Sequence, residues 1–465
     1  MLSPDDYLIT ISLFPKLMGG IYFIVLTSFL YQVRGLLCSS GILPIQKYLD
    51  LVRTKYKDYY WFLPSIYWIN SSDRMIYGSI IAGIFVSILL MFGIYPPLML
   101  LLLYILYLSI VSSGQTFLSF GWDVFILEIT CNAFFLAMSP TPNPFIWISI
   151  NFLLMRFHIQ AGAVKLQSRD EHWRDLTAIH YHYQTQPLPN TQAWFFYKLP
   201  LNFHKLSSIS MFVVELAIPF LIFTTPEIRL FVCVNFIGLQ FIIWFTGNLA
   251  YLNHMSCVLS TILIADNFLK PYFPMPTVTE TPLGINIAIS LVGIALCSLQ
   301  FIQFWHHFFP NQMFYKILNS IAPLKIINRY GIFAVMTTKR YEIVIEGSSD
   351  GKEWKEYLFP WKPSEVDRRP RRNAPYHPRL DWQLWFLPFT SYYREYWFQS
   401  FLAHLLRGNP AVLYLLRYNP FPEAPPKFIR ASLYDYVFSD WEDLQKGIWW
   451  KRTYYAPYSP TLTLS

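Results

Sequence analysis

Long apolar runs, separated by short breaks, fill most of the chain between residues 11 and 305. A helix that crosses a bilayer needs about 20 mostly apolar residues. The breaks GIYPPL, SPTPNP and TGNL carry proline or glycine–asparagine, which end helices. The candidate spans are 11–31, 76–94, 97–112, 120–138, 145–163, 208–225, 229–246, 249–266 and 283–305. The pattern predicts a polytopic α-helical membrane bundle with eight or nine transmembrane helices.

Two long polar segments, 32–75 and 164–207, interrupt this multi-pass transmembrane domain, which we place at 1–320. With nine spans, both segments and the C-terminal tail fall on one face of the membrane. The two segments carry more Lys and Arg than the loops of the opposite face. By the positive-inside rule, this charge bias predicts that the shared face is cytoplasmic.

The pattern changes at about residue 325, where runs of alternating polar and apolar residues replace the long apolar stretches. The strand-like run YEIVIEG is followed by SSDGK, whose Asp-Gly step is a hairpin signal. YREYWFQSFLAHLLRG has helical spacing and ends at glycine, whereas KFIRASLYDYVFSD and GIWWKRTYYAPY resemble further strands. The pattern predicts a C-terminal soluble domain at 325–465, of the α+β class and rich in strands.

The composition supports a membrane protein. Charged residues make up 14% of the chain, against about 25% in soluble domains. Aromatic residues make up 19%, and tyrosine and tryptophan favour the membrane–water interface. The net charge is +8, but acids are interleaved with the bases and no nucleic-acid-binding motif is present. We therefore expect membrane lipid, and no nucleic acid, as a partner. The acidic N-terminus does not match a cleavable signal peptide.

Ionisable side chains inside apolar spans are costly unless they are paired, so each one is a candidate functional residue. Glu128 and Glu215 are natural partners for Lys165 or Arg156, because a buried charge without a counter-ion is strongly destabilising. The predicted structural polar network contains Gln115, Asp123, Glu128, Arg156, Lys165, Glu215 and Asn248. A chemical role stays open for Lys165 and His158, which are seven residues apart and share a helix face with Gly162 between them.

The segment that begins AGAVKLQSRDEHWRDLTAIHYHYQTQPLPN at residue 161 is dense in charge, histidine and aromatic residues. We expect it to fold over the mouth of the bundle, as a lid or as a surface that contacts a client protein. The residues predicted for this surface are Trp173, Arg174, His180, His182 and Gln186. Neither an H-E-x-x-H motif nor a C-x-x-C pair is present, so we expect no metal and no cofactor. A G-x-S-x-G nucleophile motif is also missing, so the chain is not an evident lipase.

The blocks G-x-x-K-L, W-R-x-L-T and Y-H-Y-x-T-Q-P-x-P in this segment resemble the lipase maturation factor family. YQVRGLLCSSGILP, GQTFLSFGWDVFILE and NRYGIFAVMTTKRYEIVIEGSSDGKEW are similar to other blocks of that family. The resemblance implies a chaperone-like protein that helps secreted dimeric lipases to fold, assemble and become active. Its implied partner is an immature secreted lipase or another hydrolase client.

The resemblance also implies a location. Family members lie in the endoplasmic reticulum membrane, with the C-terminal domain in the lumen, whereas the loop charges predict a cytoplasmic face. For a bacterial chain, the expected location is the cytoplasmic (inner) membrane.

A fainter resemblance links Gly162, Lys165, Leu166, Asp170 and Trp173 to the vitamin K-dependent carboxylases, which have a reactive lysine in a similar setting. It implies an alternative function, an integral membrane enzyme that uses Lys165 as a base. A transporter is a third alternative, but the chain shows no inverted repeat.

Overall fold

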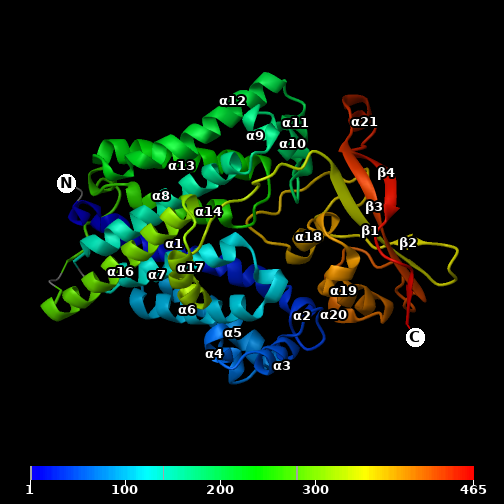
Figure 1. The fold of residues 1–465 in the computed structure, drawn as a ribbon, viewed down its shortest axis with the longest axis horizontal. Coiled ribbons are helices and arrows are strands. Elements are labelled where there is room, and N and C mark those ends of the chain that lie inside the picture. The colour runs from blue at the N-terminus through cyan, green and yellow to red at the C-terminus, as the bar shows by residue number, and fades with distance from the viewer. Residues whose placement is uncertain (1–2, 140, 279–280, 465) are drawn as a thin grey trace.

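The computed structural model describes residues 3–139, 141–278 and 281–464. A bundle of long helices makes up most of the molecule, and a small antiparallel sheet with short helices forms the C-terminal end (Figure 1). The long helices are α1 (Leu8–Leu30), α5 (Asp73–Met91), α6 (Pro96–Ser113), α7 (Gly121–Ala137), α8 (Pro144–Gln167), α12 (Leu201–Phe212), α13 (Pro226–Thr246) and α16 (Leu283–Phe308). The helix α12 continues through a π-helical turn, η4 (Val213–Ala217), and a 3-10 helix, η5 (Ile218–Phe223).

Among the described residues, six helices are long and apolar enough to cross a membrane. They are Pro4–Leu30, Asp73–Met91, Pro96–Ser113, Leu201–Phe223, Pro226–Thr246 and Leu283–Phe308. The predicted count of eight or nine spans is not confirmed. The helix α7 has 17 residues, and α8 carries several polar residues along its length. The predicted span 249–266 contains only a short apolar helix, Leu252–Leu263, which reaches about 18 Å.

The helix ends follow from local chemistry. A proline is the first residue of α6, α8 and α13, a position where its missing N–H costs no hydrogen bond. The N-terminus of α1 is capped from a distant part of the chain, since the buried Asp266 carboxylate accepts from the backbone N–H groups of Leu8 and Ile9, each at 2.9 Å. The pairing also brings the negative charge to the positive end of the helix dipole.

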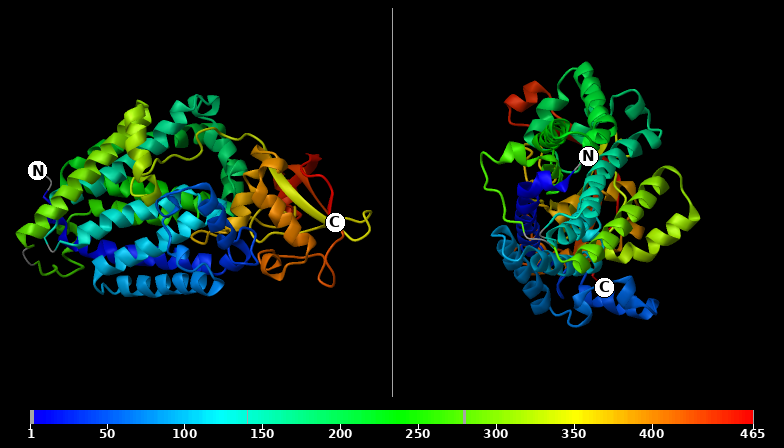
Figure 2. Two further views of the ribbon diagram at one scale, coloured as in Figure 1. Left: turned by 60° about the horizontal axis from the view of Figure 1, so that its bottom comes forward. Right: turned by 90° about the vertical axis from the view of Figure 1, so that its left-hand side faces the viewer.

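The two polar segments lie at the sheet end of the bundle, as Figures 1 and 2 show. The first forms α2 (Val33–Leu36), α3 (Ile45–Lys55), α4 (Tyr59–Phe62) and η2 (Ile66–Trp68), and the second forms α9 (Glu171–Arg174), α10 (Ala178–Thr185) and α11 (Thr191–Tyr197). Ser400 Oγ donates to Ile42 O at 2.7 Å, and Thr191 Oγ1 donates to Pro370 O at 2.6 Å. Both segments therefore share one end of the molecule with the C-terminal part.

The C-terminal part is a mixed α and β structure. Its strands are β1 (Arg340–Ser348), β2 (Lys355–Glu356), β3 (Phe428–Phe438), β4 (Trp450–Pro457) and β5 (Leu462–Thr463). Their order is β2-β1-β3-β4, with β5 also paired to β3. The helices here are α18 (Arg379–Leu384), α19 (Tyr396–Leu406), α20 (Pro410–Leu413) and α21 (Trp441–Gln445). One hydrophobic core continues from Tyr7 in the bundle to Ala431 in the sheet, so the two parts pack as one body.

The chain reaches the sheet through the bundle itself. After α16, the helix α17 (Gln312–Ile321) is followed by the 3-10 turn η7 (Ala322–Leu324), and residues 325–338 then form no helix or strand. Backbone without secondary structure is stable at membrane depth only where protein or a water-filled cavity surrounds it. The start of segment 325–338 is enclosed in this way, because Tyr330 packs on Phe125 and Phe157 and is 5% exposed, whereas Val335 further along is 66% exposed. The domain boundary at 325 stays a prediction, and the first strand begins at Arg340.

Candidate functional site

A cavity of about 780 Å³ lies between α8, α10, α12 and α13 and is closed on one side by segment 325–338. Most of its wall is apolar or aromatic, with a small number of polar side chains. His158, Lys165, His182 and Glu215 are among the polar residues that line it. The cavity thus brings together His158 and Lys165, the two candidates for a chemical role. His182 of the predicted lid and Glu215 of the next long helix lie on the same wall.

Lys165 and Glu215 form a buried ion pair on this wall. The Lys165 ammonium donates to both Glu215 carboxylate oxygens, at 2.7 and 2.9 Å, and to Ala161 O at 3.0 Å. The two side chains are 6% and 8% exposed. The ammonium also lies 5.6 Å from the centre of the Trp173 ring. The Lys165 nitrogen therefore has three oxygen atoms within hydrogen-bond distance.

A glycine allows this pair to form. A Cβ atom at Gly162 would lie 2.7 Å from Leu216 Cδ2 and 3.0 Å from Glu215 Cβ. With any larger residue at 162 the Leu216 side chain or the helices themselves must shift, so glycine favours the close approach of α8 to the η4 turn. Glu215 lies in a π-helical turn, a local widening of the helix that is frequent at functional sites.

Arg156 and Glu128 form a second, fully buried ion pair between α8 and α7. The Glu128 carboxylate also accepts from the backbone N–H of Asn328 at 2.8 Å and from the Tyr330 hydroxyl. Arg156 in turn donates to Gln303 Oε1 at 2.9 Å and to the Asn328 carbonyl. This cluster holds the start of segment 325–338 inside the bundle.

Asp123 belongs to a third cluster, which joins the bundle to the C-terminal part. Arg379 Nη1 and Nη2 donate to the two Asp123 carboxylate oxygens at 3.0 and 2.9 Å. The hydroxyls of Tyr107 and Tyr251 donate to the same carboxylate at 2.6 and 2.5 Å. All four side chains are buried. Sequence reasoning missed Arg379, because it lies 256 positions from its partner and no local pattern signals the pairing.

Gln115 and Asn248 donate to backbone carbonyls of loops rather than to charged side chains. Gln115 Nε2 donates to Leu43 O at 3.1 Å. Asn248 Nδ2 donates to Leu188 O at 3.0 Å and to Arg371 O at 2.9 Å, so it ties the second polar segment to the C-terminal part. The seven residues predicted to form one network therefore divide into three separate ion-pair clusters and two loop contacts.

The five residues predicted for the lid or client surface mostly face the protein. Trp173 is 3% exposed and its Nε1 donates to Phe333 O at 3.0 Å, and Gln186 is 2% exposed and donates to Thr246 O at 2.9 Å. His180 stacks on Tyr197, and the His182 ring lies 4.7 Å from that of Phe333. Only Arg174 is exposed. This geometry fits a cover over the cavity better than a surface for a client.

A buried arginine fixes this cover to the sheet, and sequence reasoning also missed it. Arg340, the first residue of β1, donates to the carbonyls of Gln184 and Pro187, at 3.0 and 2.9 Å, and pairs with Glu342. Glu342, two residues further along β1, also forms an ion pair with Lys362, whose Nζ lies 3.0 Å from Glu342 Oε2. The fold of the second polar segment therefore depends on the C-terminal part.

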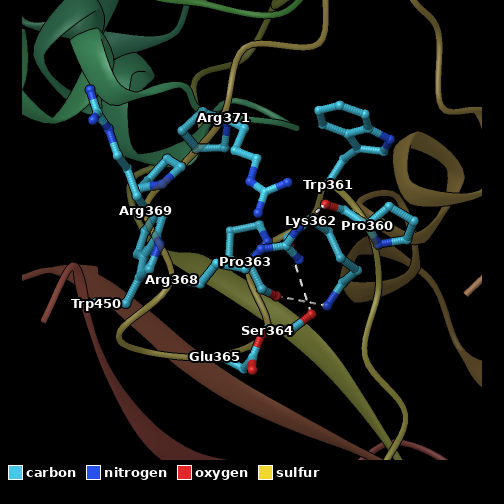
Figure 3. Close-up of a pocket in the computed structure, with 12 residues that line it drawn as sticks. Pro360, Trp361, Lys362, Pro363, Ser364, Glu365, Arg368, Arg369, Arg371 and Trp450 are labelled. Atoms are coloured by element: carbon cyan, nitrogen blue, oxygen red, sulfur yellow. Dashed lines mark hydrogen bonds between the residues drawn. The ribbon is translucent and has the colours of Figure 1, made fainter. Parts of the chain in front are cut away.

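A small crevice beside this junction is lined by several cationic side chains, including Lys362, Arg368, Arg369 and Arg371 (Figure 3). Its volume is about 10 Å³, which leaves room for about one water molecule. The Lys362 ammonium donates to Ile343 O and Pro363 O, each at 3.0 Å, and Arg368 donates to Phe359 O at 2.7 Å. These cations hold loop carbonyls in place, so we assign the crevice a structural role.

Within the described ranges, no group of three or more His, Cys, Asp or Glu residues could hold a metal ion. The five cysteines are free thiols. Burial and the nearby Asp73 carboxylate raise the pKa of the Cys38 thiol to about 12, so Cys38 is not a reactive thiolate at neutral pH.

Comparison with known proteins gives the same family for both parts of the chain. The family model described as lipase maturation factor transmembrane domain matches residues 9–271, and that of the lipase maturation factor C-terminal domain matches residues 326–460. Lipase maturation factor 1 of Bos taurus is 29% identical over 96% of this chain and 88% of its own length. The Mus musculus protein of the same name is 30% identical over 97% and 86%.

A second group of relatives is similar over nearly the same range. Lipase maturation factor 2 of Xenopus tropicalis is 27% identical over 96% of this chain and 81% of its own length. No solved structure matches the chain.

Proposed function

This chain belongs to the lipase maturation factor family, and we propose that it is a membrane-embedded folding factor that brings secreted lipases to their active, assembled form. It is an integral, multi-pass membrane protein. The proposal rests on the fact that both the transmembrane part and the C-terminal part match this family. Relatives named for lipase maturation align with 96% or more of this chain.

The bundle has more helices in its interior than the six apolar spans. We propose that α7, α8 and α14 (Leu252–Ser260), together with the turn η6 (Thr261–Leu263), add to the membrane part, which supports a total near nine. The 24 residues of α8 extend about 36 Å, enough to cross the hydrocarbon core. Its Arg156 and Lys165 are paired inside the bundle, which is how ionisable residues are accommodated at membrane depth.

We place the sheet end of the molecule in the compartment where the client folds, because a folding factor must meet its client there. In a eukaryotic cell this is the lumen of the endoplasmic reticulum. Single cysteines introduced at exposed positions on α3 and α21 would test the orientation by labelling with a membrane-impermeant maleimide. Labelling of both positions only from the lumen supports the placement, whereas cytosolic labelling contradicts it.

The exposed edge of the sheet supports client contact by the C-terminal part. The strand β4 is last in the sheet order, so among the described residues no further strand pairs with its outer edge, although the backbone N–H of Trp450 donates to Val366 O at 2.9 Å. Tyr454 and Tyr455 on β4 are 55% and 60% exposed, and Trp441 on the neighbouring α21 is 56% exposed. A sheet edge with aromatic side chains suits an extended segment of another chain, which adds to the sheet as a further strand. An immature lipase offers such segments because its own sheets are incomplete.

Restoration of lipase activity tests the function directly. The chain is expressed with a secreted dimeric lipase in cells that lack their own maturation factor, and activity and dimer content are measured in the medium. We expect the unmodified chain to restore both, and Tyr454→Ser with Tyr455→Ser to reduce both several-fold. Tyr393→Ser is the matched control, since Tyr393 is 78% exposed and belongs to the short 3-10 turn Tyr392–Arg394, outside β4. A chain that reaches the membrane but restores no activity would overturn the proposal.

The enzyme alternative has less support. A base must present a free amine, whereas the Lys165 ammonium is held by both oxygens of Glu215 and by Ala161 O. We infer that Lys165 fixes α8 to the η4 turn.

A further inference from the structure

We propose that the cavity between α12 and α13 binds a neutral amphiphile from the bilayer, with a hydrocarbon chain and a hydroxyl-bearing head group. This binding site is separate from client contact at β4, so it does not depend on the proposed maturation activity. Three properties of the cavity carry the inference: where it opens, what lines it, and which polar atoms it presents.

The cavity opens on the outer face of the bundle. Leu206 of α12 and Phe241 and Ile242 of α13 line the cavity and are also 63%, 55% and 54% exposed. Both helices belong to apolar membrane spans, so this outer face meets lipid rather than water. A hydrocarbon chain can therefore enter sideways between α12 and α13 without crossing water.

The cavity has the size and lining of a ligand site. Its volume of about 780 Å³ falls within the range of roughly 300–1,000 Å³ that binding cavities show. The wall is largely aliphatic and aromatic. The buried charged pair lies at α8 and η4, whereas α12 and α13 contribute only neutral polar side chains. This arrangement orients an amphiphile with its chain toward the opening and its head group toward Lys165 and Glu215.

The polar atoms at this end accept hydrogen bonds rather than attract an anion. The Lys165 nitrogen has Glu215 and Ala161 O as its partners, so it offers no free proton to an anion. Arg329, the other cation that lines the cavity, lies in segment 325–338 and is exposed. His158 lines the cavity and is 1% exposed, and its Nδ1 lies 3.0 Å from Leu154 O. In a neutral ring this bond places the proton on Nδ1, which leaves Nε2 as an acceptor.

His158 Nε2 has no hydrogen-bond partner in the part of the chain that the structure describes. A buried acceptor without a partner is costly, and a hydroxyl from a bound molecule would satisfy it. The Glu215 carboxylate also accepts and would repel a second carboxylate. The chemistry therefore favours an alcohol over a fatty acid anion.

Photolabelling of the purified full-length chain tests the site. Three probes share one long hydrocarbon chain with a photoreactive group and differ only in their head, which is an alcohol, a carboxylate or hydrogen. We expect the alcohol to label residues of α12 and α13 that line the cavity, and excess unlabelled alcohol to prevent the labelling. The carboxylate and the alkane should label these residues several-fold less.

A pair of glycine variants provides the matched control. A Cβ at Gly238, which lines the cavity, has no atom within 4 Å, and the same holds for Gly78 of α5 outside it. Gly238→Leu fills the cavity and should reduce labelling by about tenfold, whereas Gly78→Leu should leave it unchanged. Equal labelling of both variants, or labelling spread over the outer helix faces, would overturn the site.

His158→Phe tests the head group separately. The phenyl ring retains the stacking on Phe236, where the ring centres are 3.7 Å apart, and removes the acceptor. Labelling by the alcohol should fall to the level of the alkane. If the alcohol still labels more strongly than the alkane, or if the carboxylate labels the unmodified chain as strongly as the alcohol, the assigned head group is wrong.

Discussion

Arg379 in the C-terminal part and Asp123 in the first turn of α7 form a bidentate ion pair, with N–O distances of 2.9 and 3.0 Å. Arg379 is 1% exposed and Asp123 is fully buried. The pair lies where the bundle meets the C-terminal part, so it joins two regions that the sequence pattern separates. Tyr107 and Tyr251 also donate to Asp123, so the carboxylate is well satisfied. Among the described residues, its charge is compensated by the arginine alone.

Removal of Arg379 should destabilise the whole protein. Arg379→Met leaves the Asp123 charge buried without its partner, which costs about 3–5 kcal/mol. Thermal unfolding of the detergent-purified protein, followed by size-exclusion fluorescence, should show a clearly lower Tm. Arg394→Met is the control, since Arg394 is exposed and forms no ion pair among the described residues. An unchanged Tm for Arg379→Met would contradict the assigned role of the pair.

The Lys165–Glu215 pair should show strong coupling in a double-mutant cycle. Lys165→Met and Glu215→Met each leave one buried charge without its partner. Each should lower the free energy of unfolding by about 3–5 kcal/mol. The double variant replaces the pair by apolar side chains and should recover most of that loss. Unfolding of all four proteins in a denaturing detergent titration measures the coupling. Additive losses would show that the two side chains do not stabilise each other.

Lys165→Arg separates a structural role from a chemical one. Arginine retains the charge and a bond to Glu215, but it stays protonated near neutral pH and cannot act as a base. We expect the variant to retain most of its ability to restore secreted lipase activity, measured per amount of folded protein. Complete loss of this ability in a variant that folds and binds the client would favour the enzyme alternative.

Much of the architecture was predictable because helix-forming apolar runs and their breaks are local signals. The runs ending at GIYPPL and TGNL correspond to α5 and α13, and the Asp-Gly step at 350–351 lies in the turn between β1 and β2. Span 249–266 was harder, since apolar composition does not separate a crossing helix from a short buried one. Segment 325–338 resembles the start of a soluble domain, yet long-range bonds to Glu128 hold it in the bundle.

The candidate site was predictable in its residue types but not in its partners. Pairing rules for buried charge restricted Arg156 and Lys165 to a few acids, and the structure selects Glu128 for one and Glu215 for the other. Spacing cannot show that Asp123 pairs with Arg379, because the contact depends on how the C-terminal part docks. The inward orientation of Trp173 could not be predicted from the sequence either, because an aromatic residue in a polar segment fits a surface as well as a lid.

Gly162 should tolerate no larger residue. In Gly162→Ala, the new Cβ would meet Leu216 Cδ2 at 2.7 Å and Glu215 Cβ at 3.0 Å, so the Leu216 side chain must shift or α8 and η4 must move apart. Overpacking of this kind costs about 1–3 kcal/mol and should also loosen the Lys165–Glu215 pair. Gly20→Ala is the control, because a Cβ at Gly20 of α1 has no atom within 4 Å. Equal Tm values for the two variants would show that the helices separate without cost.

Acid should destabilise the lid through His182. Burial, and then the positive charge of Lys165, lower the pKa of His182 to about 4, against about 6.5 in an unfolded chain. The folded state therefore keeps the ring neutral, and this contribution is complete above pH 6.5 and is lost as the pH falls toward 4. By linkage, His182 alone accounts for up to about 3 kcal/mol across this window.

Burial also lowers the pKa of His377, so this residue adds to the loss of folding stability as the pH falls. His182→Phe keeps an aromatic ring beside Phe333 and removes the titrating group, so its Tm should fall less between pH 7 and pH 4.5 than that of the unmodified protein. Thermal unfolding of both proteins at several pH values between these limits measures the difference. Parallel Tm curves would mean that His182 is protonated as readily in the folded protein as in the unfolded chain.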